Sequence, residues 1–150
     1  MSRVVKAKDA VVAQDLRKTY GAGESQVTAL NNASIRVGVS KFLAIMGPSG
    51  SGKSTLMQCL AGLDSIDSGN IKIGGIDITS LNDRDLTRLR REHVGFIFQH
   101  FNLVSTLTAE QNIMLPMKLA KRQVDQELFN NVVERLGIKS RLSHKPHEMS

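Results

Sequence analysis

Several short apolar stretches in the first half of the chain have the length and spacing of strands. The apolar residues within 11–16 predict a first strand, and alternation of apolar and polar residues over 33–37 predicts a second. The isoleucines within 71–78 flank Gly74 and Gly75, which is the pattern of a β-hairpin with a two-residue turn. These stretches therefore predict four short strands.

Two continuous apolar runs, 42–46 and 94–98, are typical of strands that are buried on both faces. The second run leads into Gln99, which then lies where open α/β sheets bind ligands, at the carboxyl end of a strand. Gln99 is therefore a candidate site residue. The residue type alone fits an ordinary loop glutamine equally well.

Helical signals follow in the second half of the chain. Residues 80–83 and 108–111 have capping-box patterns, which predict the starts of two helices. Pro116 is expected to kink or end the second of them. Apolar residues at every fourth position over 124–136 predict one more amphipathic helix, with Gly137 at its end.

The stretch 47–55 lies between the apolar run 42–46 and a segment with leucines at helical spacing. Its pattern, G-x-x-x-x-G-K-S between a strand and a helix, is that of a phosphate-binding loop. Glycines let the backbone approach a ligand, and consecutive amides at a helix N-terminus attract anions. In this pattern Lys53 reaches the β- and γ-phosphates and Ser54 binds Mg²⁺. The alternative is a Gly/Ser-rich turn, but the flanking elements favour nucleotide binding. The candidate binding residues are Gly47, Pro48, Ser49, Gly50, Ser51, Gly52, Lys53, Ser54 and Thr55.

Composition narrows the class of protein. Of the 150 residues, 41% are hydrophobic and 23% are charged, as in soluble globular proteins. No apolar run has membrane-spanning length and no signal-peptide pattern is present, so a cytoplasmic location is expected. The formal net charge is +6, but only 4% of residues are aromatic and the basic residues are dispersed. No dedicated nucleic-acid binding is therefore expected. The single cysteine, Cys59, is expected to be buried.

Several motifs together resemble the ATP-binding subunits of ABC transporters. Residues 47–55 match that family's phosphate loop, G-P-S-G-S-G-K-S-T, and residues 61–69 match the stretch after the loop helix. Residues 96–99, Phe-Ile-Phe-Gln, match the strand that leads to the family's glutamine loop. Residues 101–116 resemble the lipoprotein-release, macrolide-efflux and antimicrobial-peptide branch. Tyr20 matches the family's adenine-stacking aromatic, although the residue type alone favours an ordinary half-buried ring.

The resemblance implies an α/β fold of the P-loop NTPase, ABC ATPase type. This fold would combine an antiparallel β part, an incomplete RecA-like core and the start of a helical subdomain. Residues 1–98 would form the N-terminal part of the nucleotide-binding core with its β subdomain. Residues 99–150 would form the glutamine loop and the beginning of the helical subdomain, and the C-terminal catalytic part has no counterpart.

The resemblance also implies a function, in which ATP binding and hydrolysis drive export or release of a substrate by a membrane permease. ATP and Mg²⁺ would be the cofactors, with Tyr20 on the adenine, Ser54 and Gln99 on Mg²⁺, and Lys53 and Gln99 in catalysis. The implied partners are the permease and a second ATP-binding subunit in a homodimer. The subunit would be peripheral on the inner face of the cell membrane. The motifs leave the substrate open, because the permease largely selects it.

The sequence departs from the family pattern in two places. Ser40-Lys41 stands where Gly-Glu is usual, which is a turn change outside the site. Residues 144–150 resemble the approach to the family's signature sequence and reach only its serine, Ser150. The rest of the signature, the later Asp-Glu strand and the switch histidine have no counterpart, so the resemblance predicts a truncated cassette. Two alternatives stay open: a nucleotide-binding or regulatory module without turnover, and an ABC-type ATPase that acts on nucleic acid.

Overall fold

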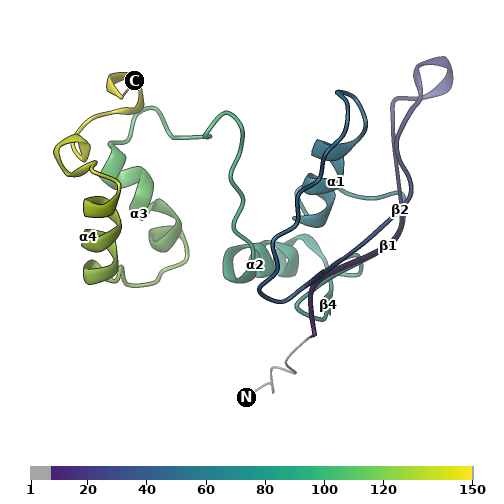
Figure 1. Cartoon of the computed structure of the whole chain (residues 1–150), viewed down its shortest axis with the longest axis horizontal. Coiled ribbons are helices and arrows are strands. Elements are labelled where there is room, and N and C mark those ends of the chain that lie inside the picture. Colours follow the sequence, from purple (N-terminus) through teal and green to yellow (C-terminus); the bar gives the residue numbers. More distant parts are fainter. Residues whose placement is uncertain (1–7, 150) are drawn as a thin grey trace. The chain divides into compact units, whose positions relative to one another are not determined.

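The computed structural model describes residues 8–149, and Figure 1 shows their secondary structure. These residues form two compact units, of which one ends at Phe96 and the other begins at Ile97. Ser150, where the resemblance to the signature sequence stops, lies outside the described residues.

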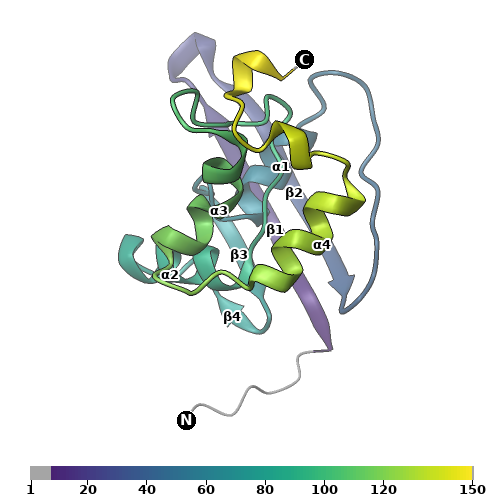
Figure 2. The ribbon, with the colours of Figure 1, turned by 90° about the vertical axis from the view of Figure 1, so that its left-hand side faces the viewer.

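A four-stranded antiparallel sheet is the framework of the first unit. Its strands, in the order β2-β1-β3-β4, are β1 (Asp9–Tyr20), β2 (Val27–Gly38), β3 (Ser68–Ile73) and β4 (Ile76–Asp77). Figure 2 shows the long β1 and β2 strands side by side, and a 3₁₀ turn at Gly23–Ser25 connects them. The strands predicted within 11–16 and 33–37 are confirmed. Each extends beyond its apolar stretch because β1 and β2 pair over nearly their whole lengths.

The predicted hairpin is confirmed at β3 and β4. Ile73 pairs with Ile76, and Gly74 and Gly75 form the two-residue turn between them. The φ angles of these glycines are +56° and +84°. Two successive left-handed residues are what a turn matched to the twist of the strands requires, and glycine adopts them without a steric cost.

Two helices, α1 (Lys53–Leu60) and α2 (Asp83–His93), complete the first unit. The core draws on the sheet and both helices. Its members include Leu16, Cys59, Ile71 and Leu89, each at most 5% exposed. The expected burial of Cys59 is thus confirmed. Cys59, with the partly buried Leu56 and Leu60, joins α1 to this core.

Helices α3 (Ala109–Leu119) and α4 (Gln126–Arg135) are the α-helices of the second unit's described residues. Two 3₁₀ turns follow, at Lys139–Arg141 and Pro146–Glu148. Pro116 lies inside α3, which ends a few residues later. None of the helices within residues 8–149 combines the length and the apolar character needed to span a bilayer.

Side chains just before α2 and α3 cap the N-termini of these two helices. Asn82 caps α2 by accepting a hydrogen bond from the Asp85 amide at 3.0 Å, so the cap lies within 80–83 but not at Ser80. The capping box predicted for α3 is confirmed. The Gln111 amide donates to Thr108 Oγ1 at 3.2 Å, and the Thr108 amide donates to Gln111 Oε1 at 2.9 Å.

The predicted helix over 124–136 is confirmed as α4, but its predicted buried face is wrong. Phe129 and Val133 are buried instead. Both sets of apolar residues have helical spacing, so the sequence offers two adjacent apolar faces, and packing selects the face that carries the large phenylalanine ring. The residues of the other face, Leu128, Val132 and Leu136, are exposed.

Neither continuous apolar run forms a strand, so these two predictions are wrong. Phe42 in the first run is 94% exposed and Ile97 in the second is 95% exposed. A buried parallel strand takes its hydrogen bonds from strands on both sides. The sheet of the described residues consists of β1, β2, β3 and β4 and includes neither run.

Candidate functional site

Residues 47–52 of the phosphate-loop pattern form a loop, and Lys53, Ser54 and Thr55 are the first three residues of α1. Lys53, the first residue of α1, folds its side chain back across this loop. Its Nζ lies 2.9 Å from the Gly47 carbonyl oxygen, 2.5 Å from the Pro48 carbonyl oxygen and 3.4 Å from Ser51 Oγ. An ammonium group has three donors, so acceptors from both ends of the loop hold it in place. The backbone therefore curves around a positive charge.

Gly52 fixes how the loop meets the sheet. Its φ is +84°, and a Cβ at this position would lie 2.3 Å from the carbonyl oxygen of Ala29 in β2. Such a contact is far inside the van der Waals separation, and its partner is backbone. Only glycine therefore lets the loop pass this close to β2 before α1 begins.

The N-terminus of α1 has no negative charge of its own. Its first turn contains no acidic residue, and its N-cap, Gly52, has no side chain to accept from the amides. The other three α-helices of residues 8–149 each have an acidic residue in the first turn and a side-chain cap, which is Asn82, Thr108 or Asp125. The first amides of a helix lack intrahelical acceptors and carry the positive end of its dipole. With Lys53, the start of α1 therefore suits an anion, and Ser54 is exposed there.

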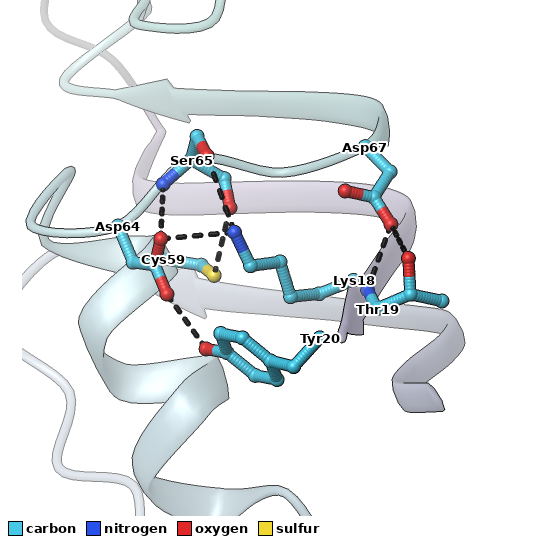
Figure 3. A network of polar contacts seen from close by, with 7 residues as sticks. All are labelled: Lys18, Thr19, Tyr20, Cys59, Asp64, Ser65 and Asp67. Atoms are coloured by element: carbon cyan, nitrogen blue, oxygen red, sulfur yellow. Dashed lines mark hydrogen bonds and ion pairs between the residues drawn. The ribbon is translucent and has the colours of Figure 1, made fainter. Parts of the chain in front are cut away.

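Tyr20 lies at the end of β1, in the polar network that Figure 3 shows. Its hydroxyl donates to Asp64 Oδ2 at 2.6 Å, and Lys18 Nζ donates to Asp64 Oδ1 at 2.9 Å. Lys18 Nζ also donates to Ser65 Oγ at 3.2 Å and lies 5.1 Å from the centroid of the Tyr20 ring. Tyr20 is 41% exposed. It is therefore anchored through its hydroxyl while part of its surface stays accessible.

These contacts shift three pKa values. Hydrogen bonds from Tyr20 and then Lys18 lower the pKa of Asp64. The hydrogen bond to Asp64 raises the pKa of Tyr20, and likewise that of Lys18. The protonation states are thus a carboxylate, a neutral phenol and an ammonium. The ammonium is charge-paired inside the fold, because Lys18 is only 7% exposed.

The sequence patterns assigned no role to Lys18 or Asp64, although both hold Tyr20. A signal was present for the lysine. It follows Leu16 by two residues on β1, and both are buried, as expected for residues on one face of a strand. A buried lysine needs an anionic partner. Which carboxylate supplies it depends on the tertiary structure.

Gln99 is exposed and belongs to the second unit, whereas the phosphate loop and Tyr20 belong to the first. Its part in metal binding stays a prediction. Among residues 8–149 no group of three or more His, Cys, Asp or Glu side chains is placed to hold a metal ion.

The ABC transporter family model matches residues 30–150. The chain belongs to the ABC transporter family. One relative of this ABC transporter chain is the bacitracin export ATP-binding protein BceA of Halalkalibacterium halodurans, 40% identical over 140 residues. Another is the macrolide export ATP-binding/permease protein MacB of Escherichia coli K12, 42% identical over 139 residues. The matches cover 92% and 91% of this chain, but 55% of BceA and 22% of MacB. The chain thus spans about half the length of BceA.

Solved ABC cassettes share this fold. The ATP-binding cassette MJ0796 matches with a TM-score of 0.83 and 36% sequence identity, over 93% of this chain and 63% of that one. That structure is a dimer in a post-hydrolysis state, bound to ADP and Pi. A second dimeric structure, described as a bacterial ABC transporter cassette, matches equally well. The predicted α/β fold of the ABC ATPase type is therefore confirmed.

Proposed function

We propose that this chain carries the nucleotide-binding half of an ATPase site that powers export through a membrane permease. One observation carries the proposal: the phosphate loop curves around Lys53 at the uncapped, positive end of α1. Gly52 supports it, because an added Cβ would fill the space where loop and β2 meet. The residues present thus fit a polyphosphate.

The roles follow from the chemistry of each group. Lys53 and the backbone N–H groups of the non-proline residues from Gly47 to Thr55 would bind the phosphates, and Pro48 would shape the loop. The Ser54 hydroxyl, with Gln99, would hold Mg²⁺, which when bound neutralises charge on the β- and γ-phosphate oxygens. Tyr20 would stack on the adenine ring. The loop backbone and the helix dipole are parts of the fold and would act on the phosphates from fixed positions. Lys53 Nζ would exchange the Gly47 and Pro48 carbonyl oxygens for phosphate oxygens.

The relatives support the choice of partners. BceA is described as a bacitracin export ATP-binding protein, and MacB as a macrolide export ATP-binding/permease protein. The MJ0796 cassettes are dimers. We therefore propose a membrane permease and a second ATP-binding subunit as partners, with this chain peripheral on the inner face of the membrane.

Replacing Lys53 with alanine in the full-length protein tests the site. Charge-assisted hydrogen bonds are worth about 1.5–3 kcal/mol, so Lys53→Ala should weaken ATP binding at least about tenfold in calorimetry and abolish phosphate release. Lys72→Ala is a matched control, because Lys72 is an exposed lysine on β3, and it should bind ATP normally. Unchanged ATP affinity in Lys53→Ala would defeat the assignment. ATP binding without turnover in the unmodified protein would instead identify a non-hydrolysing module.

A further inference from the structure

We propose that Asp64 is a positioning residue for the nucleotide base: its carboxylate ties the Tyr20 ring to the end of the helix that begins at the phosphate loop. The inference rests on the proposed role of Tyr20 in adenine binding. Asp64 would touch neither base nor phosphate and would act through the tyrosine.

The Asp64 carboxylate can position the ring because its two oxygens accept from different donors. Oδ2 accepts the Tyr20 hydroxyl at 2.6 Å. Oδ1 accepts from Lys18 Nζ at 2.9 Å and from the Ser65 amide at 2.7 Å. Lys18 and the Ser65 amide thus hold the carboxylate in place through Oδ1. Oδ2 is then left to accept from the Tyr20 hydroxyl and to fix the ring.

Backbone hydrogen bonds connect Asp64 to α1. The Leu63 and Asp64 amides donate to the Gln58 carbonyl at 2.9 and 3.4 Å, and the Gly62 amide donates to the Cys59 carbonyl at 2.9 Å. Cys59 is fully buried in the core. These bonds therefore fix Asp64 to the C-terminal end of α1. Lys53 is the first residue of the same helix.

Helix α1 also sets how far the Tyr20 hydroxyl lies from the phosphate loop. The helix runs from Lys53 to Leu60, and Asp64, which accepts from the hydroxyl, follows its last turn. An α-helix rises about 1.5 Å per residue. The length of α1 therefore sets the distance between the phosphate loop at its N-terminus and the Tyr20 ring.

The size of the effect follows from the freedom that the ring would gain. A side chain has three staggered χ1 wells, and Tyr20 is 41% exposed. If a released ring filled these wells equally, about a third of the molecules would be competent, and ATP would bind about threefold more weakly. A ligand without a base would be unaffected.

Calorimetry on the full-length protein in Mg²⁺ buffer, with ATP and with inorganic tripolyphosphate, tests the inference. Tyr20→Phe keeps the ring and the Lys18–Asp64 pair but removes the hydrogen bond between the ring and Asp64. It should weaken ATP binding about threefold and leave tripolyphosphate binding unchanged. Asp64→Ala should do the same, and the double variant should bind ATP no more weakly than Asp64→Ala. Thr19→Val is the matched control, because Thr19 is the neighbour of Tyr20 on β1 and its hydroxyl donates to Asp67 instead of Asp64. This variant should behave as the unmodified protein.

Tyr20→Ala separates failure of the inference from failure of the proposed function. If Tyr20→Ala weakens ATP binding while Tyr20→Phe does not, the ring binds the base without help from Asp64 and the inference is overturned. Equal weakening of ATP and tripolyphosphate, or additive effects in the double variant, also overturns it. If Tyr20→Ala leaves ATP affinity unchanged, the proposed role of the ring fails instead. Tyr20→Phe decides the question even if Asp64→Ala does not fold.

Discussion

Replacing Gly52 with alanine would show how tightly the phosphate loop is packed against the sheet. The new Cβ would lie 2.3 Å from the Ala29 carbonyl oxygen, at a φ of +84°. A left-handed conformation costs a residue with a Cβ about 1–2 kcal/mol. Forcing an extra carbon into a packed site costs about 1–3 kcal/mol more. We therefore expect Gly52→Ala to lower the free energy of unfolding by about 2–5 kcal/mol.

Gly50→Ala is a matched control in the same loop. Gly50 has a φ of +81°, nearly the value at Gly52, but a Cβ there would have no atom within 4 Å. This variant should carry the backbone cost alone, about 1–2 kcal/mol. The difference between the two variants isolates the contact between the loop and β2.

Urea unfolding of the full-length protein without nucleotide, followed by circular dichroism, measures this difference. Both variants should keep the m-value of the unmodified protein, because the surface exposed on unfolding is the same. Gly52→Ala should be less stable than Gly50→Ala by about 1–3 kcal/mol. Equal stability of the two variants would refute the argument that the loop rests on the Ala29 carbonyl.

Two further predictions concern the Lys18–Asp64 pair. Asp64→Ala leaves a buried ammonium unpaired and should cost about 2–4 kcal/mol, somewhat less than in a fully enclosed pair. Lys18→Met leaves Asp64 bonded to Tyr20 and to the Ser65 amide, so this variant should lose less than about 1 kcal/mol of stability. Adding Lys18→Met to Asp64→Ala should restore stability, because the unpaired ammonium is then gone. Thermal unfolding measures these differences, and equal losses of stability in the two single variants would contradict the prediction. The second prediction is that the difference in Tm between the unmodified protein and Asp64→Ala depends on pH. Because the pKa of Asp64 is lowered, its contribution is present above about pH 4 and is lost as the pH falls through the lowered value. Because the pKa values of Tyr20 and Lys18 are raised, their contribution is present below about pH 10 and is lost as the pH rises further. A Tm difference that stayed constant from about pH 2 to about pH 7 would exclude an ionised Asp64 as the source.

Local patterns were sufficient where the stabilising contacts lie within a few residues of one another. The capping box at 108–111 and the glycine turn at 74–75 both occur where the sequence predicts them. The start of α1 just after Gly52 follows from the loop pattern for the same reason. In each case the hydrogen-bonding groups and the φ angles belong to one short segment, so the segment by itself specifies the structure.

Long-range contacts decided the rest. The runs 42–46 and 94–98 have the composition of buried strands, yet a strand exists only where neighbouring strands supply its hydrogen bonds. The two apolar faces of α4 are equivalent in sequence, and packing chose the one with Phe129. The bond between Lys18 and Asp64 joins residues 46 positions apart. The sequence by itself determined where a phosphate loop begins and which helix follows it. The tertiary structure decided what holds Tyr20, because its partner meets β1 only when α1 packs into the shared core.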